Sequence, residues 1–208
     1  MEFRRIENLP PYVFTIINNL KIEARRAGHD VIDLGFGNPD IPSPEIAVRK
    51  LAEAAHNPRN HRYSLSRGLP KLREAIAGYY KQKWDVDLDT ELEITNTIGS
   101  KEGFSHLMWV LLDHDDAAIV PSPSYPIHIY GPLFAGADLR QVPMRFLADP
   151  DQREHFADDF MESLKTAYDV GWPKPRVLVI SFPHNPTGAI VDLAFMQRVV
   201  DFCREHDM

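Results

Sequence analysis

Short apolar runs alternate with longer amphipathic segments along most of this chain. The most marked run extends from Val177 to Phe182, is rich in β-branched residues and stops at Pro183. A continuous apolar run of this length is typical of a strand buried on both faces, as in a parallel sheet. Further short strands are predicted at Val31–Leu34, Glu93–Ile98, Asp116–Val120 and Leu139–Pro143.

Helices are predicted where apolar residues recur every three or four positions. Val13, Ile16, Ile17 and Leu20 form such a face near the start, and Gly28 is placed to end that helix. Phe146–His155 is predicted as an acidic loop. The predicted helices cover Tyr12–Ala27, Pro44–Ala55 behind a Ser43 cap, a segment from Pro70 through Tyr80, a segment carrying Phe104–Leu111, a short stretch to Phe134, Asp158–Tyr168 and a segment from Leu193.

Strands and helices alternate in the predicted order from Glu93 onward. This order favours an α/β fold, with helices layered around a mainly parallel sheet. The first 45 residues resemble an arm and a lobe more than a layer of that sheet. In such folds ligands bind beyond the carboxyl ends of the strands, and Asn185 lies just after the Val177–Phe182 run.

Composition narrows the class of protein further. The 208 residues include 44% hydrophobic and 25% charged residues, which is ordinary for a globular protein, and the formal charge is −7. A mildly acidic chain without a basic run argues against nucleic acid or a membrane surface as partner. Cys203 is the single cysteine, so no intrachain disulfide forms and a cytoplasmic location is expected. No metal site is expected.

The segment Gly99–Gly103 is a candidate anion site because it leads from a predicted strand into a helix. The first amides of a helix lack intrahelical partners, and the helix dipole favours a negative charge there. Ser100 adds a hydroxyl and Lys101 a positive charge, so a phosphate would fit. A glycine-flanked helix start without a ligand would explain the same residues.

Tyr125 is a candidate for stacking on a flat heterocycle, because Pro123 and Pro126 hold it in a turn after a predicted strand. It could equally be a turn aromatic packed on the surface. Gly35 and Gly37 flank another turn, and by themselves they fit an ordinary tight turn.

Several motifs, taken together, resemble those of the pyridoxal-phosphate (PLP) aminotransferases of fold type I. They are Asn-Pro-Thr-Gly at 185–188, Gly-Ser-Lys-Glu-Gly at 99–103, Tyr125 between prolines, Tyr63 followed by Gly68 and Leu72-Arg73, and Gly37 in Gly-Phe-Gly-Asn-Pro-Asp. They occur in the family's order, and bacterial alanine-synthesising glutamate–pyruvate transaminases are the most similar subgroup.

The resemblance implies a role for each of these residues. Asn185 would hydrogen-bond the phenolic oxygen of PLP, with a cis peptide bond before the next proline. Ser100 and Lys101 would lie at the cofactor phosphate, and Tyr125 would stack on the pyridine ring. Tyr63 would reach the phosphate in the partner subunit of a homodimer. Gly37 would meet the substrate carboxylate.

The resemblance also implies a domain plan. Residues 1–45 would form an N-terminal arm and the start of the small domain. Residues 46–208 would form the first half of a three-layer α/β/α PLP-binding large domain, incomplete at its C-terminus. The substrates would be an amino acid and a 2-oxo acid.

The family's catalytic residues have no counterpart in the sequence. The aspartate beside the pyridine nitrogen, the Schiff-base lysine in Ser-x-Ser-Lys and the carboxylate-binding arginine are all absent. No catalytic residue is therefore assigned, and the chain alone is expected to be inactive. It is expected to be the N-terminal half of an aminotransferase. The alternatives are a non-catalytic PLP-fold binding or dimerisation module and a PLP lyase of the same fold.

Overall fold

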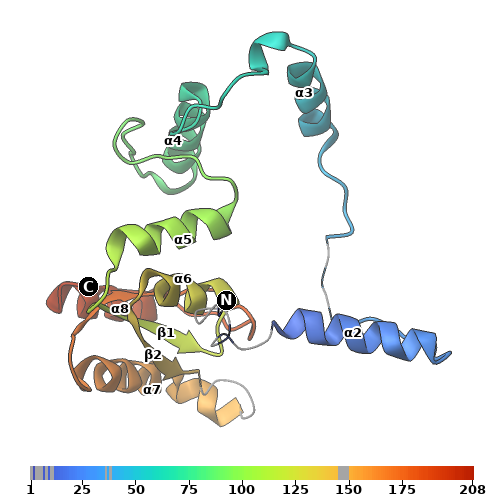
Figure 1. The fold of residues 1–208 in the computed structure, drawn as a ribbon. Coiled ribbons are helices and arrows are strands. Elements are labelled where there is room, and N and C mark those ends of the chain that lie inside the picture. The colour runs from blue at the N-terminus through green and yellow to red at the C-terminus, as the bar shows by residue number, and fades with distance from the viewer. Residues whose placement is uncertain are drawn as a thin grey trace. The chain divides into compact units, whose positions relative to one another are not determined.

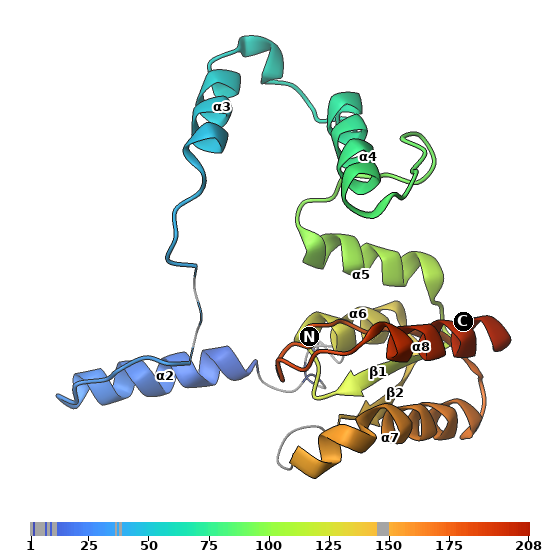
Figure 2. The same ribbon diagram turned by 180° about the vertical axis from the view of Figure 1, so that it is seen from behind.

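A computed structural model of the chain describes residues 2, 7, 9, 12–35, 37, 39–144 and 150–208. The chain divides into two compact units, Met1–Tyr63 and Ser64–Met208 (Figures 1 and 2). The division predicted between residues 1–45 and 46–208 stays a prediction.

The first unit contains two helices and one helical turn, with no buried core along the helices. Its elements are α2 (Val13–Arg26), α3 (Glu45–Ala55) and the 3-10 turn η1 (Pro58–Asn60). Both helices lie where the apolar spacing predicts them, yet no residue of either is buried. The predicted Ser43 cap is wrong, because Pro44 occupies the cap position and no side chain caps α3.

The predicted strand at residues 31–34 is wrong. These residues form no regular structure, and Ile32 and Leu34 are 81% and 93% exposed. A strand needs a neighbour to accept and donate its backbone hydrogen bonds. The part of the chain that the structure describes supplies no such neighbour here, so an apolar pattern alone does not make a strand.

The second unit is built on a three-stranded parallel sheet. Its strands are β1 (Ala117–Ser122), β2 (Asp138–Pro143) and β3 (Pro175–Leu178), in the order β2-β1-β3. In the register, Ala118 lies opposite Leu139 on one side and Val177 on the other. Both faces of the central strand β1 are covered by other residues, so Ala117 to Pro121 are buried.

Helices cover both faces of this sheet and make three layers. The helices of this unit are α4 (Pro70–Trp84), α5 (Ser100–Leu111), α6 (Pro126–Ala135), α7 (Pro150–Asp169) and α8 (Leu193–Glu205). Ala118 and Val120 face a cluster that includes α5 and α6, whereas Ile119 faces a cluster formed with α7 and α8. Figure 1 shows α5 and α6 on one side of the strands and α7 on the other. The predicted α/β/α class is confirmed.

Local signals set the helix ends around the sheet. Gly136 ends α6 with a φ of 98°, a left-handed conformation that glycine adopts without a steric cost. The Asp192 carboxylate caps α8 by accepting a hydrogen bond of 2.8 Å from the backbone N–H of Phe195. Gly136 thus sets the end of α6, and Asp192 sets the start of α8.

Three further predictions about the second unit need correction. Residues 93–98 form no strand, because none of the strands in the described chain pairs with them. The predicted acidic loop 146–155 is helical from Pro150 as part of α7, and residues 146–149 lie outside the described residues. The strand predicted at Val177–Phe182 starts two residues earlier, and its ladder ends at Leu178.

We expect the face packed against α7 to dominate the stability of the second unit. Leu164 is completely buried there, so Leu164→Ala removes buried apolar surface and leaves a cavity. The free energy of unfolding should fall by about 3 kcal/mol. Urea unfolding followed by circular dichroism measures it. Leu193→Ala, at an 83% exposed position, is the matched control and should change it by less than about 0.5 kcal/mol. Equal losses in both variants would contradict the assignment of the core.

Candidate functional site

The sheet order places the segment after β1 beside the segment after β3, because these two strands are parallel neighbours. From β1 the chain passes through α6 to β2 on one side, and then through α7 to β3 on the other side of β1. Connections that leave in opposite directions form a topological switch point, and open α/β sheets bind ligands beyond the carboxyl ends of the strands at such points. The segments that follow β1 and β3 are therefore the first candidates for a binding site.

Lys101 and Tyr125 meet at this end of the sheet. Tyr125 follows β1 and caps α6, and the Lys101 ammonium lies 5.4 Å from the centre of its ring. Ser100, which precedes Lys101, is the first residue of α5. The structure thus brings the phosphate-turn candidates and the stacking candidate together from different elements.

The start of α5 is suited to bind an anion. Gly99 precedes the helix with a φ of 84°, and no side chain caps this helix end. Gly103 lies in the first turn, where an added Cβ would come within 2.9 Å of Thr97. This contact requires a glycine and draws the helix close to the chain that enters it. Backbone amides, the Ser100 hydroxyl and the Lys101 charge make a donor set that fits a phosphate.

The turn after β3 is closed by hydrogen bonds around His184, which is only 3% exposed. The His184 N–H donates to the Ala189 carbonyl at 2.7 Å, and the Gly188 N–H donates to the His184 carbonyl at 2.6 Å. Asn185 is exposed in this turn, and its bond to Pro186 is cis, as the family resemblance implies. The backbone of the turn is therefore closely defined.

His128, on α6, lies close to Tyr125 and near His184 of this turn. Its ring centre lies 5.8 Å from that of Tyr125 and 5.0 Å from that of Phe104 on α5. Burial lowers the pKa of His128, and the nearby His184 lowers it further; burial also lowers the pKa of His184. The sequence interpretation missed both histidines. Their positions, three residues after Tyr125 and directly before Asn185, were the available signal.

Arg73, the last residue of the Tyr63 motif, is a further residue whose importance was missed. It is 6% exposed, and its guanidinium donates to the Thr90 carbonyl at 2.7 Å and to the Gly68 carbonyl at 2.9 Å. It also pairs with the Glu91 carboxylate at 2.6 Å. Arg73 thus ties the chain before α4 to the chain after it.

Tyr63 and Gly37 belong to the first unit, and both are exposed there. Within the second unit, Lys101 and Tyr125 are in contact, and Asn185 follows β3, the strand beside the one that precedes Tyr125. The roles proposed for Tyr63 and Gly37 stay predictions.

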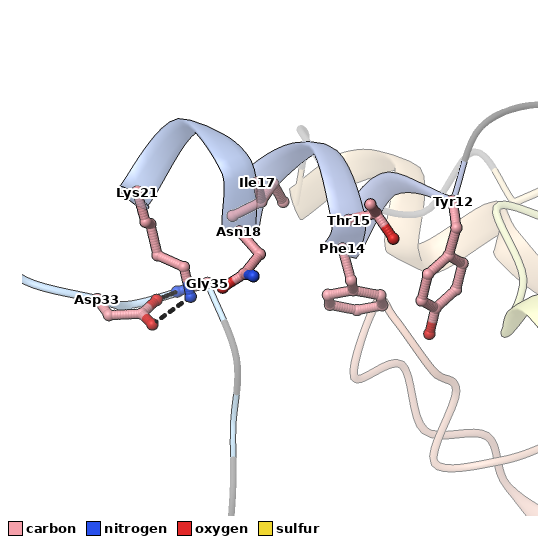
Figure 3. A pocket seen from close by; sticks show the side chains of 8 residues that line it. All are labelled: Tyr12, Phe14, Thr15, Ile17, Asn18, Lys21, Asp33 and Gly35. Atoms are coloured by element: carbon pink, nitrogen blue, oxygen red, sulfur yellow. Dashed lines mark hydrogen bonds and ion pairs between the residues drawn. The ribbon is translucent and has the colours of Figure 1, made fainter. Parts of the chain in front are cut away.

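The first unit has a pocket of about 450 Å³ between α2 and the segment before Gly37 (Figure 3). The Lys21 ammonium lies 2.6 Å from the Asp33 carboxylate, whose other oxygen accepts a 3.0 Å hydrogen bond from the Gly35 N–H. The hydrogen bond from Lys21 is the main cause that lowers the pKa of Asp33. The lining residues are Tyr12, Phe14, Thr15, Ile17, Asn18, Lys21, Asp33 and Gly35.

In the described part of the chain, the His, Cys, Asp and Glu side chains form no group of three or more that could hold a metal ion. Within the same residues, no helix combines the length and the apolar character needed to cross a membrane.

We expect the fold to lose stability as the pH falls below about 6.5, the ordinary histidine pKa. The folded chain lowers the pKa of His128 and His184, so below pH 6.5 the unfolded chain binds more protons than the folded chain. Stability present above pH 6.5 is then lost towards the lowered pKa values, by up to about 1.4 kcal/mol per pH unit for each proton.

Urea unfolding near pH 7.5 and near pH 5.5 measures this loss. The double variant His128→Gln, His184→Gln should lose less stability between the two pH values than the parent. His29→Gln, at an exposed position, is the control and should behave like the parent. An unchanged pH dependence in the double variant would refute the role of the two histidines.

Known proteins resemble this chain in sequence and in structure. A relative from Escherichia coli (strain K12), the glutamate-pyruvate aminotransferase AlaC, is 46% identical over 99% of this chain and 48% of its own length. An LL-diaminopimelate aminotransferase from Moorella thermoacetica is 40% identical over the whole chain and 50% of its own length. A Thermus thermophilus aspartate aminotransferase mutant is similar in structure, with a TM-score of 0.80 and 28% identity over the whole chain and 51% of its own length.

The chain thus spans about half the length of these relatives. The family model for aminotransferase class I and II matches residues 29–208. The chain belongs to the class I and II aminotransferases, a family that uses pyridoxal 5′-phosphate.

Proposed function

We propose that the chain forms the N-terminal half of an aminotransferase that moves an amino group between an amino acid and a 2-oxo acid. The observation that carries the proposal is the contact of Lys101 with Tyr125, where the start of α5 meets the segment after β1. The chain's length, about half that of its relatives, supports its assignment to one half of such an enzyme.

The residues of the second unit fit PLP by their chemistry. Ser100 and the first amides of α5 would donate hydrogen bonds to the phosphate, and Lys101 would add a positive charge. Tyr125 would offer its ring face to the pyridine ring. The Asn185 amide would donate to the phenolic oxygen. When bound, PLP supplies an electron sink for the substrate's α-carbon.

The family resemblance assigns roles to two residues of the first unit. Gly37 would present its backbone to the substrate carboxylate, and Tyr63 would reach the cofactor phosphate in the partner subunit of a homodimer. Exposed apolar side chains on α5, such as Trp109 and Val110, support the proposal that further protein covers this helix. We also propose that the enzyme is cytoplasmic.

Glutamate and pyruvate are the substrates that we propose. The similarity to the Escherichia coli glutamate-pyruvate aminotransferase supports them, and the similarity to LL-diaminopimelate aminotransferases makes diaminopimelate the substrate to compare. The test begins with the gene: the codons beyond Met208 should encode Asp-x-Ala-Tyr and then Ser-x-Ser-Lys. The complete protein should turn over glutamate with pyruvate faster than diaminopimelate with 2-oxoglutarate. The reverse order would overturn the substrate assignment.

We expect the 208-residue chain alone to have no transaminase activity. It lacks the lysine that would hold PLP as a Schiff base and move the substrate proton. The purified chain should show no turnover of glutamate with pyruvate above buffer, and borohydride treatment with PLP should label no lysine. Turnover together with a reduced adduct on Lys101 would contradict this expectation.

A further inference from the structure

The Thr187 side chain is placed at the centre of the turn that carries Asn185. Its hydroxyl oxygen accepts a hydrogen bond of 3.3 Å from the Ala189 N–H and lies 2.8 Å from Nδ1 of His184. We propose that Thr187 and His184 form a clasp that positions the Asn185 amide for the phenolic oxygen of PLP. This inference rests on the proposed function, and it assigns positioning roles to two residues beside the cofactor contact.

Asn185 depends on its backbone for orientation. Its side chain is exposed and makes no hydrogen bond to any other described residue. The two backbone hydrogen bonds between His184 and residues 188–189 close the turn at its base. The clasp adds a side-chain link across the same turn, from His184 to Thr187 and on to Ala189. The direction of the Asn185 side chain therefore follows from a turn that Thr187 holds closed.

The hydroxyl can serve both partners at once. A hydroxyl accepts through its lone pairs and donates one proton, so Thr187 can accept from the Ala189 N–H and, according to the tautomer of the imidazole, either donate to Nδ1 of His184 or accept from its Nδ1–H. The neutral imidazole suits the site, because His184 is buried and burial lowers its pKa.

His184 acts through the turn rather than on the substrate. Its Nε2 atom is buried and has no hydrogen-bond partner among the described residues. Among the exposed residues of the turn, Pro183, Asn185, Pro186 and Gly188, Asn185 is the one whose side chain can donate a hydrogen bond to a ligand. A donor at the phenolic oxygen favours the ionised form of that oxygen. A turn that no longer holds Asn185 in place should therefore raise the pH at which the absorption band of bound PLP changes.

The test uses the complete protein encoded by the gene, loaded with PLP. Thr187→Val removes the hydroxyl and keeps the shape, Thr187→Ala removes it with less bulk, and Thr187→Ser keeps it. Thr166→Val is the matched control, because the Thr166 hydroxyl donates to the Glu162 carbonyl in the exposed part of α7. Asn185→Ala serves as the reference for complete loss of the amide.

We expect Thr187→Val and Thr187→Ala to raise the pH midpoint of the PLP absorption change by about 0.5–1 unit. Both should weaken PLP binding several-fold. Thr187→Ser and Thr166→Val should match the parent, and Asn185→Ala should shift the midpoint most. Circular dichroism at each pH confirms that the variants are folded, and Thr187→Ala gives the readout if Thr187→Val does not fold.

A parent-like midpoint in the folded Thr187→Val or Thr187→Ala protein, with a shift in Asn185→Ala, would overturn the clasp and leave the proposed function intact. A parent that binds no PLP, or an Asn185→Ala protein without a shift, would overturn the proposed contact of Asn185 and the clasp with it.

Discussion

The burial of β1 on both faces, with a parallel strand on either side, is the constraint on which the second unit depends. Ala117 to Val120 are completely buried, and alternate residues face different helices. Because β1 is central, the chain must leave it towards β2 and return past it to β3. This route places the segment after β1 and the turn after β3 at the same end of the sheet. The position of the site is thus a consequence of the packing of one strand.

The local pattern was sufficient wherever an element meets its partners within the chain. The apolar runs near Ala117–Ser122 and Asp138–Pro143 became strands, because each has a neighbour and a covering helix. The segments 31–34 and 93–98 were also predicted as strands, but no strand in the described part of the chain lies beside them. Strand propensity depends on a pleated, half-buried surface that other strands provide. The pattern shows which residues can pair, and only the arrangement of the sheet shows which do.

The residues of the candidate site could likewise be predicted only where the sequence signal is local. The turns around Ser100, Tyr125 and Asn185 could be identified from glycine, proline and polar residues at predicted strand ends. The contacts of His128 with Phe104 and of Arg73 with Thr90 and Glu91 could not, because these partners lie far away in the sequence. The Arg73 partners Thr90 and Glu91 come after α4, the helix that contains Arg73. A single sequence carries no direct record of such pairings.

The hydrogen bonds of Arg73 also bear on how α4 can move. One side chain near the start of the helix holds the Gly68 carbonyl before it and the Thr90 carbonyl after it. The two connecting segments are thereby attached to the helix itself and not only to its ends. A shift of α4 that left either segment in place would break one of these hydrogen bonds. The segments at residues 68 and 90 are therefore linked through one buried guanidinium as well as through the helix between them.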